Sequence, residues 1–326
     1  MRAIVFDQPG DENVLHIGDV PRPEMKDDEL RIRVRATAVN RADLLQRQGF
    51  YPPPPGASPI LGLECAGEVI EVGAAAHGWQ IGERAMALLP GGGYAEEAVV
   101  HAGSAMHVPA ALSDAEAGAL PEVFLTAFLN IFLLGEAMQG SSVLVHGGGS
   151  GVGTATISLC REAGARILVT AGSAEKCRRC LAHGADVAIN YNDGDFAPVV
   201  REATGGRGVD VVLDSIGGRY LASNLASLAM DGRLVIIGLM GGGHSEIDLA
   251  ALLMQRQRVI GSALRTRPAE EKAAIVSAFV ARFGPAIAAG RVSPVIDRVL
   301  PLEDAAEAHR IMKASQHFGK IVLRVS

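Results

Sequence analysis

The chain has 326 residues, of which 48% are hydrophobic and 20% charged, and it carries a formal net charge of −6 at pH 7. This length can bury a substantial core in two domains, and the acidic balance argues against a nucleic-acid surface, which needs clustered Lys and Arg. Small molecules are therefore the expected partners. Four scattered cysteines, and an opening MRAIVF without a secretory pattern, favour a reducing, cytoplasmic compartment.

Short strand patterns separated by Gly and Pro dominate residues 1 to about 120 and predict a β-rich half. They are RAIVF, ELRIRVRATAVN, GEVIEVG and YAEEAVV. The proline-dense FYPPPPGASPILG follows a helical RADLLQRQG, and we interpret it as a stiff loop rather than a polyproline ligand. The apolar run VFLTAFLNIFLLG is shorter than the roughly 20 residues of a membrane span, so it predicts a buried helix and no membrane association.

After about residue 121, strand and helix patterns alternate. Six apolar runs, SVLVHG, RILVTAG, DVAINY, VDVVLDSIG, RLVIIGLM and RVIGSAL, are joined by helical segments such as GTATISLCREAG, SAEKCRRCLAHG and NLASLAM. This alternation predicts an α/β fold with a doubly wound, parallel, six-stranded sheet. Residues 269–326 then predict two helices and a last strand, GKIVLRV, that pack back on the first domain.

A glycine-rich turn joins the first of these strands to its helix, in VLVHGGGSGVG. Gly148 and Gly153 fit the ends of the dinucleotide-binding pattern, and Ser150 takes its middle place. Glycines there let a pyrophosphate approach the backbone N–H groups and the positive end of the helix dipole. The six-strand setting favours nucleotide binding over an ordinary turn.

The choice between NAD and NADP depends on the end of the second strand, which reads TAGSAEK. Residues 170–173 include no Asp or Glu that would bind a ribose 2′-hydroxyl; Glu175 nearby is a complication. Ser173 can donate to a 2′-phosphate and Lys176 can pair with it, so the sequence favours NADP(H). The alternative is that Ser173 only caps the helix and Lys176 is solvated.

Several motifs in chain order resemble those of a known family: AVNRADLLQRQG, PPPPGASPILGLECAGEV, LPEVFLTAF, HGGGSGVG, DSIGG and GKIVL. The chain resembles the quinone oxidoreductase branch of the medium-chain dehydrogenase/reductase superfamily, most closely the p53-inducible quinone oxidoreductase type. The resemblance implies a GroES-like, β-rich catalytic domain formed by residues 1–121 and 267–326. It also implies a Rossmann NADP(H)-binding domain over residues 122–266, and a homodimer paired through residues 233–264.

The chain departs from the zinc-dependent members of that superfamily. Those enzymes carry a catalytic Cys where this chain has Asn40, and a Gly-His-Glu where it has Gly62, Leu63 and Glu64. Without these ligands, and without the cysteine-rich lobe of a structural site, we expect no zinc. Cys177 and Cys180 stand alone on a predicted helix and do not predict a metal or redox pair.

The resemblance also implies the site residues. Asn40 and Asp43 would lie beside the nicotinamide, and Tyr51 would stack on the substrate or donate to its oxygen; the alternatives are a helix-capping acid and an ordinary loop aromatic. His146 is interpreted as a structural, hydrogen-bonded histidine. The cofactor contacts implied are Thr126, Ser150, Gly151, Val152, Ser173, Lys176, Tyr191, Gly238, Met240, Leu264, Arg265, Thr266, Gly319 and Lys320.

The leading hypothesis is an NADPH-dependent oxidoreductase that reduces quinones without a metal. A quinone that accepts hydride becomes an aromatic hydroquinone anion with delocalised charge, so it needs less electrophilic help than a simple ketone. The alternatives are an NADPH-dependent alkenal or enone reductase, and an NADPH-binding protein without useful turnover.

Overall fold

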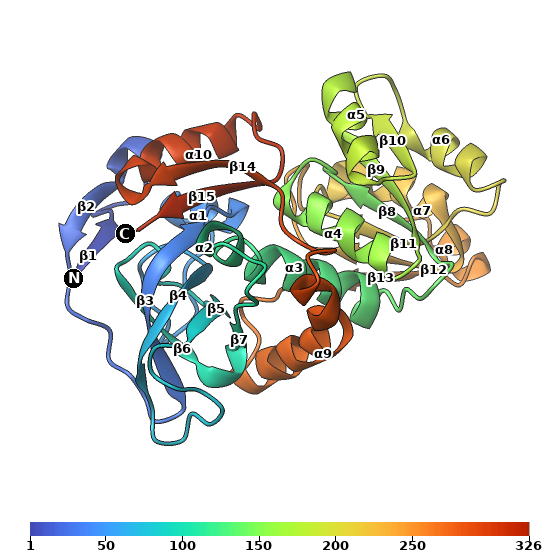
Figure 1. The fold of residues 1–326 in the computed structure, drawn as a ribbon. Helices are drawn as coiled ribbons and strands as arrows, with labels where there is room; N and C mark the ends of the chain where they lie inside the picture. Colours follow the sequence, from blue (N-terminus) through green and yellow to red (C-terminus); the bar gives the residue numbers. More distant parts are fainter. Residues whose placement is uncertain (326) are drawn as a thin grey trace. The chain divides into compact units, whose positions relative to one another are not determined.

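The computed structural model describes residues 1–325, which form two compact units: residues 1–125 with 264–325, and residues 126–263. Figure 1 shows the first unit as mixed blue, teal and red segments, because both ends of the chain contribute to it. The N-terminal part of this unit ends at residue 125 and its C-terminal part begins at residue 264, whereas the sequence predicted 121 and 267.

A seven-stranded sheet organises the first unit. Its strand order is β14 (Ile296–Pro301), β15 (Lys320–Arg324), β3 (Glu29–Ala38), β4 (Glu64–Val72), β5 (Arg84–Leu88) and β7 (Ala105–His107), and β6 (Glu97–His101) also pairs with β3. β1 (Arg2–Val5) and β2 (His16–Asp19) form a separate antiparallel pair. The sequence patterns predicted β1, β3, β4, β6 and β15, but not the short β2, β5, β7 and β14.

Alternation along β3 builds the core of this unit. Leu30, Ile32 and Val34 are buried in the main apolar cluster, whereas Arg33 between them is exposed. The helices of the unit are α1 (Arg41–Arg47), α2 (Asp114–Ala117), the start of α3 (Pro121–Phe128), α9 (Ala269–Ala288) and α10 (Ala305–Lys313). Buried alanines of α10 pack in the same cluster, so the C-terminal part of the chain completes the N-terminal core.

A parallel six-stranded sheet organises the second unit, in the predicted doubly wound order. The order is β10 (Val187–Asn190), β9 (Arg166–Ala171), β8 (Ser142–His146), β11 (Val209–Asp214), β12 (Leu228–Ile236) and β13 (Arg258–Gly261). Successive strands are added on one side of β8 up to β10 and on its other side from β11 onward. Such sheets bind nucleotides at the point where this order reverses.

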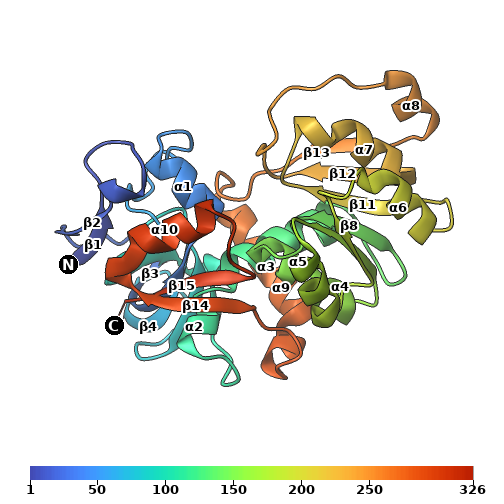
Figure 2. The same ribbon diagram turned by 90° about the horizontal axis from the view of Figure 1, so that it is seen from above.

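Helices cover both faces of this sheet (Figure 2). α4 (Gly151–Glu162) and α5 (Ala174–His183) lie on one face, and α6 (Phe196–Ala203) and α7 (Leu221–Ser227) on the other. α8 (Leu249–Met254) precedes β13. The predicted helical pattern NLASLAM is wrong in its last part, because α7 ends at Ser227 and Leu228 begins β12 by pairing with Val209 of β11.

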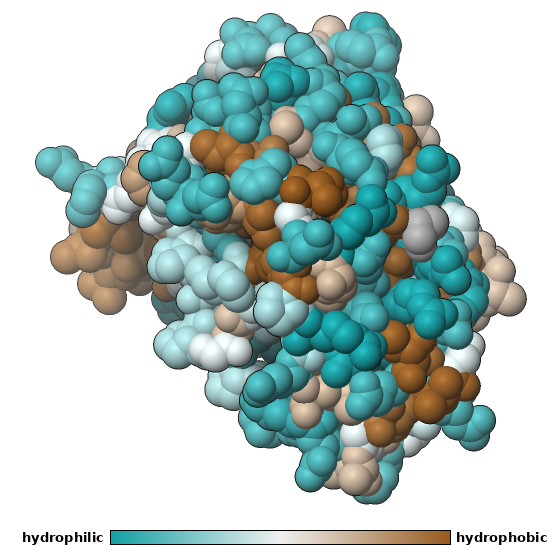
Figure 3. Space-filling view, turned by 90° about the vertical axis from the view of Figure 1, so that its left-hand side faces the viewer, coloured by the Kyte–Doolittle hydropathy of each residue, from teal (hydrophilic) through white to brown (hydrophobic). Residues whose placement is uncertain are grey.

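The predicted helix over VFLTAFLNIFLLG is present in two parts, α3 and a π-helical segment at Leu129–Leu134. Its residues are largely buried, which explains the apolar run without a membrane. No helix among residues 1–325 has the length and apolar character that crossing a membrane requires. On the face shown in Figure 3, apolar side chains form separate patches between hydrophilic ones.

Candidate active site

Three buried polar side chains meet where β3, β4 and β15 lie side by side. Val322 pairs with Ala38, and Thr37 pairs with Cys65, so this register brings Asn40, Glu64 and Lys320 to one place. The Lys320 ammonium donates to Glu64 Oε1 and to Asn40 Oδ1, both at 2.7 Å, and to the Val39 carbonyl at 3.1 Å.

Both carboxylate oxygens of Glu64 accept hydrogen bonds. Asn40 Nδ2 donates to its Oε1 at 2.9 Å, and the backbone N–H of Glu122, in the first turn of α3, donates to its Oε2 at 2.9 Å. Glu64 and Lys320 are 0% and 2% exposed. A buried ion pair is stable only when hydrogen bonds satisfy its remaining atoms, and this one meets that condition.

These residues do not fit a zinc ion. Leu63 has no ligand atom, and both oxygens of Glu64 already accept hydrogen bonds from within the chain. The Lys320 ammonium lies 2.7 Å from Glu64 and would repel a second cation. Among residues 1–325, no group of three His, Cys, Asp or Glu side chains is placed to hold a metal ion.

Asp43 lies on the first turn of α1 and is fully buried. Its Oδ2 accepts the backbone N–H of Asn40 at 2.8 Å, and its Oδ1 accepts that of Gly62 at 3.0 Å. Asp43 therefore does act as a helix-capping acid, and it joins the two segments that carry Asn40 and Glu64. Burial raises the pKa of Asp43 to about 6, although both backbone donors oppose this shift.

Tyr51 lies in the proline loop and is held by Arg265. The guanidinium carbon of Arg265 is 5.2 Å from the centre of the Tyr51 ring, and its Nη1 donates to the Tyr51 carbonyl at 3.4 Å. Arg265 also donates to Gln46 Oε1 at 2.6 Å and to the Pro90 carbonyl at 2.8 Å. Burial raises the pKa of Tyr51, so its hydroxyl stays a proton donor at neutral pH.

The glycine turn in the second unit leads from β8 into α4. Ser150 is the N-cap, and its hydroxyl accepts the N–H of Gly153 at 3.0 Å. The N–H groups of Gly151 and Val152 belong to the first helical turn and have no intrahelical partner, as a pyrophosphate site requires. A Cβ on Gly153 would lie 2.3 Å from the Gly147 carbonyl oxygen, so only glycine lets the turn fold this closely.

Ser173 follows Gly172 at the end of β9, and Lys176 lies in the first turn of α5 that Ser173 caps. The Ser173 hydroxyl caps α5 by accepting the N–H of Lys176 at 3.1 Å, which leaves its own proton able to donate. A Cβ on Gly172 would lie 2.3 Å from the Tyr191 hydroxyl, so these two residues are in close contact. A hydroxyl at the N-cap and an ammonium group in the first turn of α5 are the residue types that bind a 2′-phosphate.

The other predicted site residues lie on several segments. Thr126 is buried on α3, Gly238 and the exposed Met240 follow β12, and Leu264, Arg265 and Thr266 follow β13. Gly319 (φ +93°) immediately precedes Lys320. Their contact with a cofactor stays a prediction; Lys320 already has three oxygen partners within the chain.

His146 has the structural character that its position predicted. Its ring nitrogens bond with Thr170 Oγ1 at 3.0 Å and Asn224 Oδ1 at 2.7 Å, and burial lowers its pKa to about 4. Asp214 accepts the backbone N–H groups of Ile216 and Gly217, and burial raises its pKa to about 6. Both groups stabilise the carboxyl ends of the central strands.

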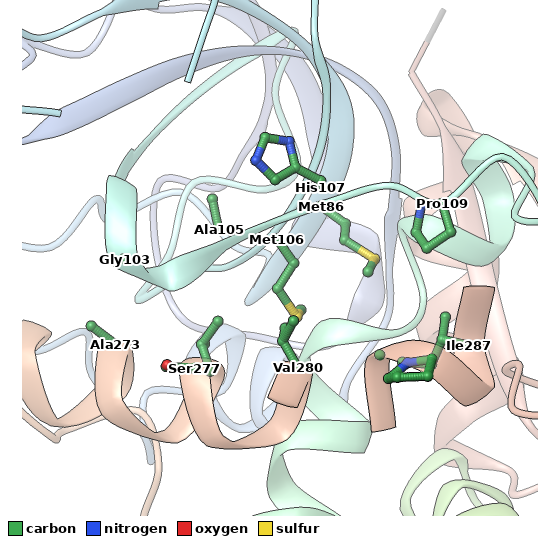
Figure 4. Close-up of a pocket in the computed structure, with 13 residues that line it drawn as sticks. Met86, Gly103, Ala105, Met106, His107, Pro109, Ala273, Ser277, Val280 and Ile287 are labelled. Atoms are coloured by element: carbon green, nitrogen blue, oxygen red, sulfur yellow. The ribbon is translucent and has the colours of Figure 1, made fainter. Parts of the chain in front are cut away.

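A cavity of about 640 Å³ lies elsewhere in the first unit, between β7 and α9 (Figure 4). The Met106 side chain points toward Val280 of α9, and the lining is apolar apart from His107 and Ser277. No predicted site residue lines this cavity.

Sequence reasoning missed the partners of the predicted residues. The sequence patterns place Glu64 only where a zinc motif is absent. They do not single out Tyr94, whose hydroxyl donates to Asp43, or His309 and Arg47, which continue the hydrogen bonding from Tyr94. The signal for Glu64 and Lys320 is a single charge within a short apolar segment, GLECAG or GKIVL, because a buried charge needs a partner.

Two family models match the chain. The alcohol dehydrogenase GroES-like domain matches residues 26–110, and the zinc-binding dehydrogenase model matches residues 151–281. The quinone oxidoreductase of Rattus norvegicus is 32% identical over 326 residues, which cover 99% of this chain and 97% of that protein. One component of the phenolphthiocerol/phthiocerol polyketide synthase of Mycobacterium tuberculosis is 31% identical over 324 residues, and the chain spans 14% of the length of that component.

Solved structures show the same fold over the full chain. A mycobacterial protein complexed with NADPH has a TM-score of 0.88 at 31% identity, and 100% of each chain is covered. The Escherichia coli quinone oxidoreductase complexed with NADPH has a TM-score of 0.87 at 27% identity, again with 100% of each chain covered. The chain belongs to the quinone oxidoreductase branch of the medium-chain dehydrogenase/reductase superfamily.

Proposed function

We propose that this protein is an NADPH-dependent quinone oxidoreductase that works without a metal ion. The observation that carries the proposal is the end-to-end similarity to quinone oxidoreductases, which covers 99% of this chain. The site supports it, because Lys320 and Asn40 donate to Oε1 of Glu64 and the backbone N–H of Glu122 donates to Oε2, so both oxygens that a metal would need are occupied.

NADP(H) is the cofactor that the second unit fits. The amides of Gly151 and Val152 bind the pyrophosphate at the N-terminus of α4, and Ser173 and Lys176 bind the 2′-phosphate. When bound, NADPH supplies a hydride. The quinone takes up this hydride and one proton and leaves as the hydroquinone.

The first unit supplies orientation and a proton donor. Tyr51 presents a flat ring and a protonated hydroxyl, so it can stack on a quinone and donate to its oxygen. Asn40 and Asp43 hold the adjoining backbone in place. Few catalytic side chains are needed, since alignment of the reacting carbons contributes much of the rate enhancement.

Lys176→Ala tests the cofactor assignment. We expect the ratio of kcat/KM for NADPH to that for NADH to fall about tenfold, the value of one charge-assisted hydrogen bond of ~1.5 kcal/mol. Lys26→Ala, which replaces an exposed lysine of the first unit, is the matched control. An unchanged ratio in Lys176→Ala would refute the phosphate contact.

The second candidate is an NADPH-dependent alkenal or enone reductase. A segment of a highly reducing polyketide synthase of Emericella nidulans is 33% identical over 326 residues, and the chain spans 12% of that synthase. Parallel assays with 1,4-benzoquinone, an ortho-naphthoquinone and a 2-alkenal separate the two candidates. We expect a higher kcat/KM for a quinone; a clear preference for the alkenal would favour the second candidate.

We further propose a homodimer that pairs through β13. This strand ends the six-stranded sheet, and Arg258 and Val259 on it are exposed. Sedimentation at micromolar concentration is expected to give twice the chain mass of 34.0 kDa, and a monomer would refute this pairing.

A further inference from the structure

A continuous run of buried hydrogen bonds leads from Arg47, one turn further along α1, through His309 and Tyr94 to Asp43. Arg47 Nη1 lies 3.1 Å from His309 Nδ1, His309 Nε2 lies 3.2 Å from the Tyr94 hydroxyl, and that hydroxyl lies 3.3 Å from Asp43 Oδ2. All four residues are 0% exposed. The run crosses from α1 to α10, which contact each other (Figure 2), and returns to α1.

The donors and acceptors of these side chains fix the direction of every hydrogen bond in the run. A guanidinium can only donate, so His309 Nδ1 accepts from Arg47 and the ring proton lies on Nε2. His309 Nε2–H then donates to the Tyr94 oxygen, and the Tyr94 hydroxyl donates to Asp43. Burial and the nearby Arg47 lower the pKa of His309 to about 3, so the ring is neutral as this direction requires.

The far end of the run reaches the surface. Arg47 donates from Nε to the Gly10 carbonyl at 3.2 Å, and its Nη2 lies 3.8 Å from Glu12 Oε2. Glu12 also pairs with Lys313 at 3.4 Å and with Arg310 at 3.6 Å. Glu12 at the edge of the unit therefore balances the charge of Arg47, while Arg47 Nη1 donates inward to His309.

The near end of the run is the carboxylate that joins the two active-site segments. With Tyr94, Asp43 accepts three hydrogen bonds, of which two come from the backbone of Asn40 and Gly62. The carboxylate accepts these three hydrogen bonds more strongly than a protonated carboxyl, which must also find an acceptor for its own proton, so the three donors favour the ionised form of Asp43. The charged and titratable groups that act on Asp43 are Lys320, Arg265 and Tyr94. Glu64, Arg47 and His309 act on Tyr94 in turn.

We propose that Arg47, His309 and Tyr94 are positioning residues, which hold Asp43 ionised and thereby fix Asn40 and Gly62 at the active site. The kinetic part of this inference rests on the proposed function. The three side chains need not touch substrate or cofactor, because they act through Asp43.

Three variants test the inference. Tyr94→Phe keeps the ring and removes the donor to Asp43. His309→Met removes the donor to Tyr94, and His309→Gln keeps an amide N–H near the place of Nε2. The acid limb of kcat/KM in the wild type is expected near pH 6, the pKa of Asp43.

Tyr94→Phe is expected to move this limb up by about one pH unit and to lower kcat about tenfold, since loss of one bond to a carboxylate raises its pKa and loosens the site. His309→Met should move the limb in the same direction, and His309→Gln should leave it nearly in place. Tyr220→Phe, whose hydroxyl has no hydrogen bond among residues 1–325, is the matched control.

A second readout needs no substrate. The infrared carboxyl band that disappears in Asp43→Asn reports the titration of Asp43, and its midpoint should rise in Tyr94→Phe. If the wild type reduces no quinone, the proposed function fails while this titration still tests the positioning role. An unmoved limb and an unmoved titration in folded Tyr94→Phe and His309→Met would overturn the proposal. Loss of the fold in all three variants would overturn it too, because the residues would then be structural only.

Discussion

At the scale of single residues, Lys320 and Glu64 are the decisive pair. Each is the buried charge at the start of its strand, and the two pair because β15 and β4 lie on either side of β3. The sequence shows both residue types, but it does not show which strands are neighbours. That is why Lys320 was expected at a cofactor, whereas the structure gives it three oxygen partners within the chain.

Lys320→Met is expected to lower the free energy of unfolding by about 3 to 5 kcal/mol, because it leaves the Glu64 carboxylate buried without its partner. Urea denaturation measures this. Lys26→Met, at an exposed position, should stay within about 0.5 kcal/mol of the wild type. The double variant Lys320→Met/Glu64→Gln should recover much of the loss, and a double variant as unstable as Lys320→Met would contradict the pairing.

Only one of the three hydrogen bonds of Asp43 follows from its local sequence. Its place three residues after Asn40 predicts a helix-capping acid, and the structure contains that contact. The contacts to Gly62 and Tyr94 join residues that are distant in the sequence, and no local pattern announces them.

At the scale of elements, the glycine turn between β8 and α4 is the feature that the sequence predicted best. The strand, the turn and the helix are local, and each has its own residue signature. The six parallel strands were predicted for the same reason. The short strands β2, β5 and β7 have no comparable pattern, because they are three to five residues long and depend on their neighbours in the sheet.

Gly153→Ala is expected to weaken NADPH binding at least tenfold, because the new Cβ would meet the Gly147 carbonyl oxygen at 2.3 Å and open the turn. Calorimetric titration with NADPH measures the change. Gly284→Ala on α9 is the control, since its Cβ would meet Val280 at an ordinary 3.4 Å; it should bind NADPH normally and raise stability by about 0.5 to 1 kcal/mol. Normal affinity in Gly153→Ala would refute the role of this turn.

Across the whole molecule, each unit holds a buried acid whose pKa is raised and a buried histidine whose pKa is lowered. The pKa of Asp43 and of Asp214 is raised to about 6, and the pKa of His309 and of His146 is lowered to about 3 and about 4. The two kinds of group have opposite effects on stability. Between about pH 4 and 6 the two acids keep their protons in the folded protein but lose them in the unfolded chain, so their contribution to the free energy of unfolding falls as pH rises. The two histidines take up protons only on unfolding, so their contribution rises with pH.

The wild-type free energy of unfolding is therefore expected to vary little between about pH 4 and 6.5. Asp43→Asn removes one falling contribution and leaves that of His309, so its stability should rise with pH across the same range. Urea denaturation at a series of pH values measures both slopes. A slope in Asp43→Asn equal to that of the wild type would contradict the raised pKa of Asp43.

In the proposed reaction, the protein passes hydride from NADPH to a quinone without a metal ion. The most direct measurement is NADPH consumption with 1,4-benzoquinone by protein that has been treated with a zinc chelator, followed by its absorbance and compared with untreated protein. Equal turnover is expected in the two preparations. Turnover that disappears with the chelator and returns with zinc, or NADPH that binds and is not oxidised by any quinone, would contradict it.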